Sequence, residues 1–261
     1  MVAITAVILT FNEAPNIART LSNLDWVRDI VVVDSFSTDE TPELIRANPK
    51  ARLFTRKFTT HAEQWNFALG ETGIETDWVL ALDADYQVTR EFRDEAATLS
   101  DSPEIGGYRA AFTYCINGRP LRGTLYPPVT VLYRRDGARY VQDGHTQRIA
   151  VRGNVGDLVS RILHDDRKPM SSWIASQNRY MRLEAAKLLS TPSAQLRWPD
   201  RIRRMRVVAP FAVLVHCLFF KGLILDGRAG LFYTAQRVFA EMMLSVYLLS
   251  HDLGLEPNAG G

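Results

Sequence analysis

Two aspartates, Asp83 and Asp85, follow the apolar stretch "WVLAL" (78–82). In an extended segment, residues two positions apart point to the same side, so these carboxylates lie close together and repel each other. A divalent cation would offset the repulsion, because carboxylate oxygens suit Mg²⁺ or Mn²⁺. The pair alone also fits a turn, where aspartate is common. Its chemistry therefore depends on what the fold brings to the same place.

Two other apolar stretches end in polar residues. "AITAVILT" (3–10) continues into Phe11-Asn12-Glu13, and "DIVVVDS" (29–35) contains Asp34 next to its end. Parallel strands of an open α/β sheet present their carboxyl ends at one edge, where ligands bind. We therefore expect the three polar strand ends to line one site.

The elements that position these residues follow from hydrophobic patterning. The first hundred residues alternate short β-branched stretches with helical patterns, which is typical of a mostly parallel sheet flanked by helices. Asn12 is expected to cap the first helix. After residue 100 the pattern favours antiparallel strands with a turn at Asp136-Gly137, followed by a helix over 170–189. The first four strands are predicted at 3–10, 29–35, 51–55 and 78–82.

Composition narrows the class of protein. The 261 residues carry 31 basic and 29 acidic side chains, a net charge of +2, which does not indicate a nucleic-acid partner. Cys115 and Cys217 lie far apart, which fits a reducing cytosol and no zinc site. The first residues read as a strand and lack the basic start of a signal peptide.

Three motifs together resemble a known family: "VILTFNEAPNI", "IVVVDSFSTDET" and "LALDADYQV". They resemble the inverting family-two glycosyltransferases of the GT-A fold, over about residues 3–190. The nearest likeness is to bacterial lipopolysaccharide-core glucosyltransferases, which share a pattern seen here as "GLILDGRAGL" (222–231). The resemblance implies transfer of a hexose such as glucose from a UDP-sugar to a lipid-linked or lipopolysaccharide-core glycan. It also implies a Mg²⁺ or Mn²⁺ cofactor and a GT-A-type, Rossmann-like sheet.

The resemblance also assigns roles to individual residues. Asp34 would accept a hydrogen bond from the uracil N3–H, Asp83 would touch the ribose or the metal, and Asp85 would bind the metal. The remaining residues of the donor pocket would be Thr10, Asn12, Glu13, Gln64 and Asn66. Purely structural roles are alternatives for several of these residues: Glu13 also suits a helix N-terminus, and Asp34 also suits a turn.

The general base is expected in "YVQDGHTQRI" (140–149). Related enzymes often carry His-Glu here, whereas this chain has His145-Thr146. The prediction therefore moves to Asp143, with His145 as the second choice because histidine is the side chain whose unperturbed pKa lies near neutral pH.

A second charged segment, "ILHDDRKP" (162–169), precedes a helix. His164 would complete the metal shell, and Arg167 and Lys168 would hold the diphosphate. The alternative is a solvated helix start with mixed charges.

The C-terminal part is basic and then apolar. "RWPDRIRRMR" (197–206) holds five arginines and one aspartate, and two apolar segments follow at 207–225 and 231–249. Pro210 and Lys221 interrupt the first of these, and the second is amphipathic. This pattern predicts a catalytic domain at 1–195 and a helical extension at 196–261.

Residues 197–249 would associate with a membrane surface, which places the protein on the inner face of the cytoplasmic membrane. The alternative is a helical subdomain or a dimer interface.

Two other functions are alternatives. A sugar-nucleotide pyrophosphorylase would need a glycine-rich basic loop after the first strand, where this chain has "TFNEAPN". A non-catalytic, membrane-bound scaffold that binds nucleotide sugars is supported only by the missing carboxylate after His145.

Overall fold

The computed structural model describes residues 2–143 and 146–255. The chain forms two compact units: unit 1 comprises Met1–Pro120 and Tyr126–Lys168, and unit 2 comprises Leu121–Leu125 and Pro169–Gly261. The sequence placed the helix that begins at residue 170 in the first domain, whereas the structure groups it with the C-terminal helices.

Unit 1 contains the strands and four helices. The strands are β1 (Ile4–Thr10), β2 (Asp29–Asp34), β3 (Ala51–Thr55), β4 (Trp78–Asp83), β5 (Tyr86–Gln87), β6 (Ile105–Ile116), β7 (Arg119–Pro120), β8 (Val129–Arg134), β9 (Arg139–Asp143), β10 (Thr146–Ala150) and β11 (Asn154–His164). The helices are α1 (Ile17–Ser22), α2 (Thr41–Arg46), α3 (His61–Glu71) and α4 (Arg90–Thr98).

Among the described residues, nine strands form one mixed sheet in the order β3-β2-β1-β4-β8-β6-β11-β5, with β7 paired to β6. The first four strands in this order are parallel, as the sequence predicted. β8 runs antiparallel to both β4 and β6, so the second half of the sheet is not parallel throughout. β9 and β10 form a separate hairpin.

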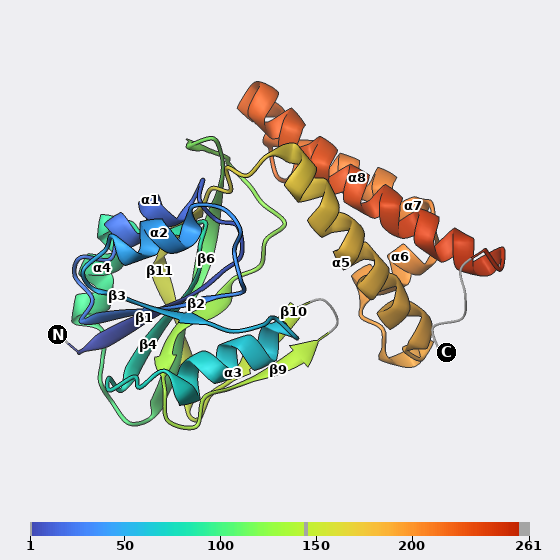
Figure 1. Ribbon diagram of the computed structural model, residues 1–261. Coiled ribbons are helices and arrows are strands. Elements are labelled where there is room, and N and C mark those ends of the chain that lie inside the picture. Colours follow the sequence, from blue (N-terminus) through green and yellow to red (C-terminus); the bar gives the residue numbers. More distant parts are fainter. Residues whose placement is uncertain (1, 144–145, 256–261) are drawn as a thin grey trace. The chain divides into compact units, whose positions relative to one another are not determined.

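Helices cover both faces of the sheet (Figure 1). On one face, α1, α2 and α4 contribute Ile17, Ile45 and Phe92 to a core with the apolar strand residues. On the other face, Trp65 of α3 packs with Tyr140 of the β9–β10 hairpin. Because β1 is buried on both faces, its sequence is continuously apolar rather than alternating.

Two local predictions need correction. Asn12 does not cap the first helix, because α1 begins at Ile17 with Asn16 as its N-cap residue, and Asn12 has φ +52°. Gly137 does lie in a turn, with φ +71°. The strands β8 and β9 that flank this turn pair with other strands rather than with each other.

β11 lies near one end of the sheet and is irregular. β5 pairs with it at Leu163 and His164, so the preceding part of β11 forms an outer edge among the described residues. A register shift interrupts its pairing with β6 between Asp157 and Arg161. There, the carboxylate of Glu95 on α4 accepts the backbone N–H groups of Val159 and Ser160, both at 2.8 Å.

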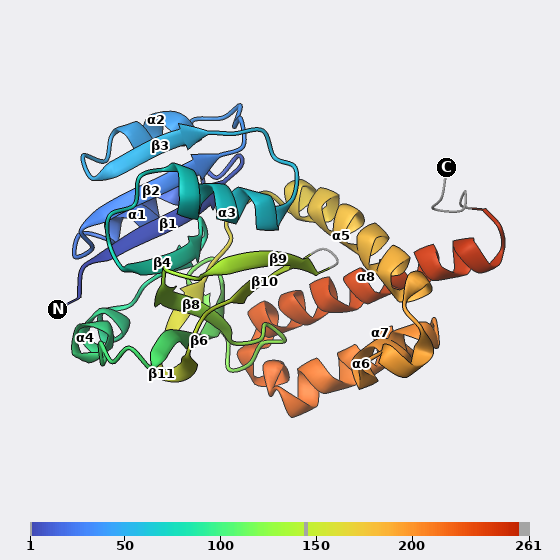
Figure 2. The ribbon, with the colours of Figure 1, turned by 90° about the horizontal axis from the view of Figure 1, so that it is seen from below.

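Unit 2 is helical. α8 packs against α5 on one side and α7 on the other (Figure 2). A Cβ on Gly230 would lie 1.9 Å from the carbonyl oxygen of Leu223, so the "GLILDGRAGL" pattern has glycine where α8 meets the preceding turn. The elements are α5 (Met170–Ser190), η1 (Ser193–Gln195), α6 (Trp198–Arg204), α7 (Val208–Val215), η2 (His216–Phe220), η3 (Leu223–Asp226) and α8 (Gly227–Asp252).

None of the helices in the described ranges is both long and apolar enough to span a membrane by itself. Residues Val208–Phe220 and Leu223–Asp252 meet the length and composition criteria as a pair, with a bend of 71° between them.

Candidate active site

The polar strand ends meet at one edge of the sheet in unit 1. In the parallel register, Thr10 of β1 lies beside Asp34 of β2, and Leu9 of β1 lies beside Asp83 of β4. The structure therefore brings together the three motifs that the sequence singled out, at the edge where α/β sheets bind ligands.

Asp34 is held rigidly. Its side chain is buried and accepts hydrogen bonds from the Thr10 hydroxyl at 2.9 Å, the Ser37 hydroxyl at 2.6 Å and the Ser37 N–H at 2.8 Å. An ionised carboxylate has about four lone-pair sites, so one acceptor position remains for a ligand N–H. Ser37 was not predicted, although it lies in the quoted "VDSFSTD" segment.

Asn12 joins the loops that follow β1 and β2. Its backbone N–H donates to the Ser37 hydroxyl at 2.8 Å, and its side-chain oxygen accepts the Thr38 N–H at 2.8 Å. Asparagine tolerates the left-handed conformation that this geometry requires. Asn12 therefore fixes the position of the loop after β2 through both its backbone and its side chain.

Asp85 and His164 form the charged centre of the site. The Nε2 atom of His164 lies 3.1 Å from Oδ2 of Asp85. Burial would raise the pKa of Asp85, but the charge and hydrogen bond of His164 and the charge of Lys168 outweigh burial and lower it. Burial would likewise lower the pKa of His164, but Asp85 outweighs it and the pKa is raised.

The same geometry fits a divalent cation. Two ligands about 2.1 Å from an ion and at right angles to each other lie about 3.0 Å apart, which matches the separation of Asp85 and His164. The described residues contain no group of three or more His, Cys, Asp or Glu side chains that could hold a metal. An ion held by Asp85 and His164 would complete its shell with water or phosphate, as Mg²⁺ and Mn²⁺ commonly do.

Asp83 supports this electrostatic picture. Burial, followed by the neighbouring charge of Asp85, raises the pKa of Asp83 to about 6. Two carboxylates at this strand end are therefore difficult to ionise together, which is the repulsion that a cation relieves.

Aromatic rings surround His164, and of these only Tyr86 lies in one of the three sequence motifs. The rings of Tyr114, Tyr126 and Tyr86 lie with centroids 4.7, 5.0 and 5.1 Å from the imidazole. The Nδ1 atom of His164 is buried and has no hydrogen-bond partner within the described part of the chain. Packing rather than a second hydrogen bond therefore orients the imidazole.

Lys168 contacts Glu13 across the site. Its Nζ lies 2.5 Å from Oε1 of Glu13, whose other oxygen accepts the Asn16 amide at 2.9 Å. Burial and the charge of Asp85 raise the pKa of Glu13 to about 7 against the opposing effect of Lys168. Burial would lower the pKa of Lys168, but Glu13 and Asp166 outweigh it and raise the pKa, so Lys168 stays cationic at neutral pH.

Arg167 is held by a buried carboxylate. Asp165 accepts hydrogen bonds from Arg19 and Arg167 and from the Gly118 N–H, each at 2.9 Å. The side chain of Asp165 is only 2% exposed, whereas Arg167 keeps 36% exposure. Arg167 and Lys168 thus reach the same edge of the sheet, each already paired with a carboxylate.

Gln64 and Asn66 both hold the backbone of neighbouring segments. Gln64 donates to the Ser35 hydroxyl at 3.1 Å and to the Arg56 carbonyl at 3.2 Å, and it accepts from the Arg56 guanidinium at 2.7 Å. The amide of Asn66 exchanges two 2.9 Å hydrogen bonds with the backbone of Tyr140 in β9. The predicted contacts of these residues with base and sugar stay predictions.

The predicted bases lie on the β9–β10 hairpin. Asp143 is the last residue of β9 and pairs with Thr146. His145 and the side chain of Asp143 lie outside the described residues, so their roles stay predictions.

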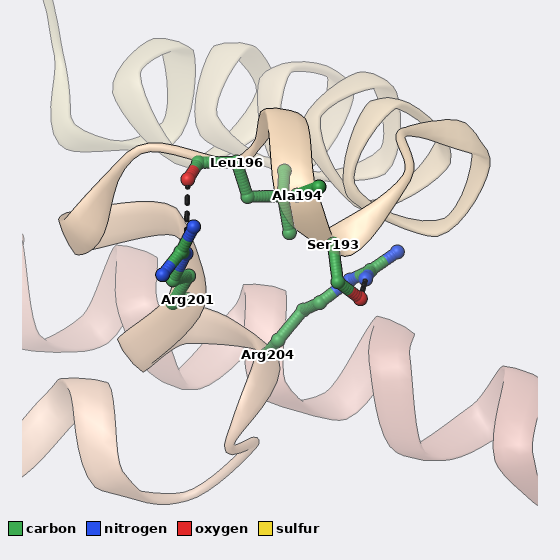
Figure 3. A pocket seen from close by; sticks show the side chains of 5 residues that line it. All are labelled: Ser193, Ala194, Leu196, Arg201 and Arg204. Carbon is green, nitrogen blue, oxygen red and sulfur yellow. Dashed lines mark hydrogen bonds between the residues drawn. The ribbon is translucent and has the colours of Figure 1, made fainter.

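A hollow of about 470 Å³ lies within unit 2. It is lined by Ser193, Ala194, Leu196, Arg201 and Arg204 (Figure 3). The Arg204 guanidinium donates to the Ser193 hydroxyl at 2.7 Å, and Arg201 donates to the Leu196 carbonyl at 3.0 Å. None of the predicted site residues lines it.

Comparison with known proteins places the site in context. Residues 5–140 match the sequence model of "Glycosyl transferase family 2". The chain is 31% identical over 198 residues to the lipopolysaccharide core biosynthesis glycosyltransferase LpsC of Rhizobium meliloti, covering 70% of each protein. It is 37% identical over 108 residues to an uncharacterized glycosyltransferase of Rickettsia bellii, covering 41% of this chain and only 36% of that relative.

Two solved structures are also similar. S. aureus TarS in complex with UDP-GlcNAc has a TM-score of 0.47 at 16% identity, covering 97% of this chain and 92% of that one. The glucosyl-3-phosphoglycerate synthase of Mycobacterium tuberculosis with Mn²⁺, UDP and product has a TM-score of 0.47 at 14% identity, covering 74% and 82%.

Proposed function

Because the chain belongs to glycosyl transferase family 2, we propose that it moves a hexose such as glucose from a UDP-sugar to a lipid-linked or lipopolysaccharide-core glycan. The observation that carries the proposal is the charged centre, where Asp85 and His164 lie 3.1 Å apart. The same edge of the sheet presents Asp34 at the end of β2, and Lys168 reaches Glu13 in the loop after β1. Family membership makes the protein a glycosyltransferase, so neither a pyrophosphorylase nor a non-catalytic scaffold is retained.

The donor nucleotide would bind along the ends of β1, β2 and β4. The remaining acceptor site of Asp34 suits the N3–H of uracil, because Thr10 and Ser37 already fix the orientation of the carboxylate. Asn12 and Glu13 would line the same pocket from the loop after β1. Gln64 and Asn66 would support it by holding the segments that flank α3.

The diphosphate would lie between the acidic strand end and the basic segment after β11. Asp85 and His164 would hold a divalent cation that neutralises charge on the departing diphosphate. A carboxylate combined with an imidazole favours Mn²⁺ over Mg²⁺, because imidazole suits transition ions better. Lys168 and Arg167 would donate hydrogen bonds to the phosphate oxygens as their carboxylate partners give way.

The transfer itself needs a base on the acceptor side. Asp143 would take the proton of the acceptor hydroxyl, with His145 as the second candidate. The acceptor oxygen would then bond to the anomeric carbon on the face opposite the diphosphate while the bond to UDP breaks, which inverts the configuration.

The acceptor class rests on LpsC, whose printed name assigns it to lipopolysaccharide core biosynthesis. A lipid-borne acceptor requires the enzyme to work at a membrane surface. We therefore propose that the protein is peripheral on the inner face of the cytoplasmic membrane and uses residues 197–249 to bind there.

A donor screen followed by a transfer assay tests the proposal. UDP-sugars are added with and without Mn²⁺, and donors are identified by an increase in melting temperature. The increase arises because a bound donor raises the free energy of unfolding by RT ln(1 + [L]/Kd). Transfer of labelled sugar to a membrane fraction with truncated lipopolysaccharide core is then compared between wild type and Asp85→Asn. The variant is expected to lose at least about 100-fold in transfer rate.

The matched control is Asp136→Asn, which makes the same change on a side chain that is 94% exposed. This control should transfer at the wild-type rate. Full activity in Asp85→Asn would refute the metal role, and a protein stabilised by no UDP-sugar would refute the donor assignment.

A further inference from the structure

The charges of segment 197–206 are largely used inside unit 2. Arg203 binds Glu241 of α8 through contacts of 2.7 and 3.0 Å and also approaches Glu184 and Asp200, at 3.7 and 3.5 Å. The charge of Arg203 therefore stabilises the packing of unit 2. It is not free to attract an anionic surface, although the sequence predicted such attraction for the whole segment.

Two further arginines of the segment are also engaged. Arg204 donates to the carbonyls of Leu188 and Thr191 at the end of α5, at 2.6 and 2.8 Å. Arg206 makes two 2.7 Å hydrogen bonds with Asp252. Arg197 and Arg201 are the arginines of the segment in the exposed class, and they too have partners: Arg197 lies 3.3 Å from Asp200, and Arg201 donates to the Leu196 carbonyl at 3.0 Å.

The outward surface of the helices that follow is instead apolar. We name it the apolar face and define it by its most exposed large side chains: Phe211, Phe219, Phe220, Leu225, Met242 and Val246, each more than 50% exposed. Apolar patches larger than a few hundred Å² are rare on soluble monomers and mark interaction sites.

On α8, polar residues of the exposed class lie only at the two ends of this surface, although Arg237 in the middle is partly exposed. From Leu231 to Leu249, every residue in the exposed class is apolar, and the exposed polar residues are Arg228 before and His251 and Asp252 after. This stretch of 19 residues is about 28 Å long at 1.5 Å per residue.

The distribution of exposed apolar residues around α7 and η2 favours lipid as the partner. Eight of the 13 residues from 208 to 220 are exposed, and seven of these eight are apolar. A protein partner covers one side of a helix, whereas lipid solvates an apolar helix over most of its circumference. The bend of 71° between the two helical parts favours entry into one leaflet over a span.

The charge around the apolar face is complementary to lipid phosphate. Between residues 201 and 250 the acidic residues are Asp226 and Glu241, and these pair with Arg122 and Arg203. Both acidic residues of this stretch are thus already paired with another arginine, and neither is left to pair with Arg228 alone.

We propose that the apolar face enters the acyl layer of one bilayer leaflet, and that this insertion rather than the arginine-rich segment holds the protein on the membrane. The proposal deepens the membrane association that the proposed function includes, but it requires no donor, acceptor or metal. Binding should consequently occur on zwitterionic lipid and resist salt.

Vesicle flotation of the full-length protein tests this proposal. Vesicles of phosphatidylcholine alone and of phosphatidylcholine with phosphatidylglycerol are compared at about 0.1 M and about 1 M salt, where screening lengths are about 10 and 3 Å. Wild type is expected to float with both lipids at both salt concentrations. Binding that requires phosphatidylglycerol and disappears at high salt would overturn the proposal.

The key variant carries Phe219→Ser, Phe220→Ser and Leu225→Ser. It is expected to lose about 100-fold or more in partitioning, because each buried apolar side chain contributes at least about 5-fold. The matched control replaces three exposed apolar residues elsewhere on the surface, Val159, Ile174 and Leu183, by serine and should float like wild type.

A charge variant and a depth probe complete the test. Arg197→Gln with Arg201→Gln should float on phosphatidylcholine within about 3-fold of wild type. Phe220→Trp should show fluorescence quenched by brominated acyl chains, and Val159→Trp should not, so the proposal can be tested even if the triple variant fails to fold.

Two further results would also overturn the proposal. One is an equal loss of flotation in the triple variant and its control. The other is a wild-type dimer that does not float and that the triple variant converts to monomer, because a second copy would then cover the face. Either result leaves the proposed glycosyl transfer standing, since flotation is measured without substrate.

Discussion

Asp165→Asn tests the idea that a buried carboxylate organises the basic segment of the site. Asp165 accepts two charge-assisted hydrogen bonds on Oδ2, from Arg19 and Arg167, and the Gly118 N–H on Oδ1. Asparagine has nearly the same shape, but it brings no charge and only one acceptor oxygen. If that oxygen faces the two arginines, the new NH₂ group faces the Gly118 N–H.

The expected cost follows from these contacts. Two charge-assisted bonds become neutral-acceptor bonds, at about 1 kcal/mol each, and one backbone bond is lost, at about 1 kcal/mol. The sum of about 3 kcal/mol lies at the lower end of the range for removing one partner of a buried ion pair, about 3–5 kcal/mol. The lower end is appropriate because Arg19 and Arg167 keep 25% and 36% exposure.

Urea titration followed by far-ultraviolet circular dichroism, together with calorimetry, measures the effect. A loss of about 3 kcal/mol corresponds to a fall in Tm of about 6–12 °C for a chain of this size. The control is Asp157→Asn, which breaks the exposed pair with Arg109, whose side chains are 65% and 48% exposed. The control should cost less than about 1 kcal/mol.

The comparison can refute the reasoning. If Asp165→Asn and Asp157→Asn lower the urea midpoint by the same amount, burial of Asp165 adds nothing to its ion pairs. The variant should also bind UDP-sugar more weakly, because Asp165 positions Arg167. Unchanged donor affinity in a destabilised protein would separate the structural contribution of Asp165 from any part in the site.

His164→Gln should weaken Mn²⁺ binding at least about 10-fold by calorimetric titration, since loss of even a residue that only supports a metal ligand lowers metal affinity that much. The control His251→Gln should bind Mn²⁺ like wild type, and equal affinities of the two variants would contradict the assignment of His164 as a ligand. Asn66→Ala should cost about 2 kcal/mol in urea titration, because two hydrogen bonds to the Tyr140 backbone are lost, and an unchanged midpoint would refute this. Burial would raise the pKa of Glu95, but hydrogen bonds from the β11 bulge outweigh it and lower the pKa. Its stabilisation is therefore present above the unfolded pKa and is lost as pH falls through the folded pKa, so Glu95→Gln should cost about 1–2 kcal/mol at about pH 7 and less at about pH 3.5. A pH-independent difference in urea midpoint would contradict that sign.

Much of the fold could be predicted because its signals are local. Continuous apolar stretches that end in polar residues located β1, β2 and β4, and the parallel register then brought Thr10, Asp34 and Asp83 to one edge. The α/β class and the resemblance to the family-two glycosyltransferases are confirmed. These depend on patterns within segments of about ten residues.

The rest of the site depends on contacts between distant segments. Asn16 donates to Asp166 across 150 positions of sequence, and nothing near Asn16 indicates that partner. Tyr114 and Tyr126 line His164 without belonging to any motif. Asn12 was expected as a helix cap because its residue type suits one, but the tertiary contact with Ser37 decides its conformation.

The C-terminal segment shows the same limit for charge. The number of arginines in 197–206 predicts a basic surface. That prediction overestimates the free charge, because a count cannot distinguish a solvated charge from a paired one. The structure pairs Arg203 and Arg206 with acidic residues 38 and 46 positions away.

The carboxylate of Glu95 at the bulge of β11 has a consequence for how copies of this protein behave in a crowded cell. An unprotected strand at the rim of a sheet is a template on which another chain can add a strand and start an aggregate. Here the side chain occupies two backbone donors that an incoming strand would need, and the bulge disturbs the straight ladder. Glu95 and the bulge thus oppose the addition of a strand from another copy at this rim.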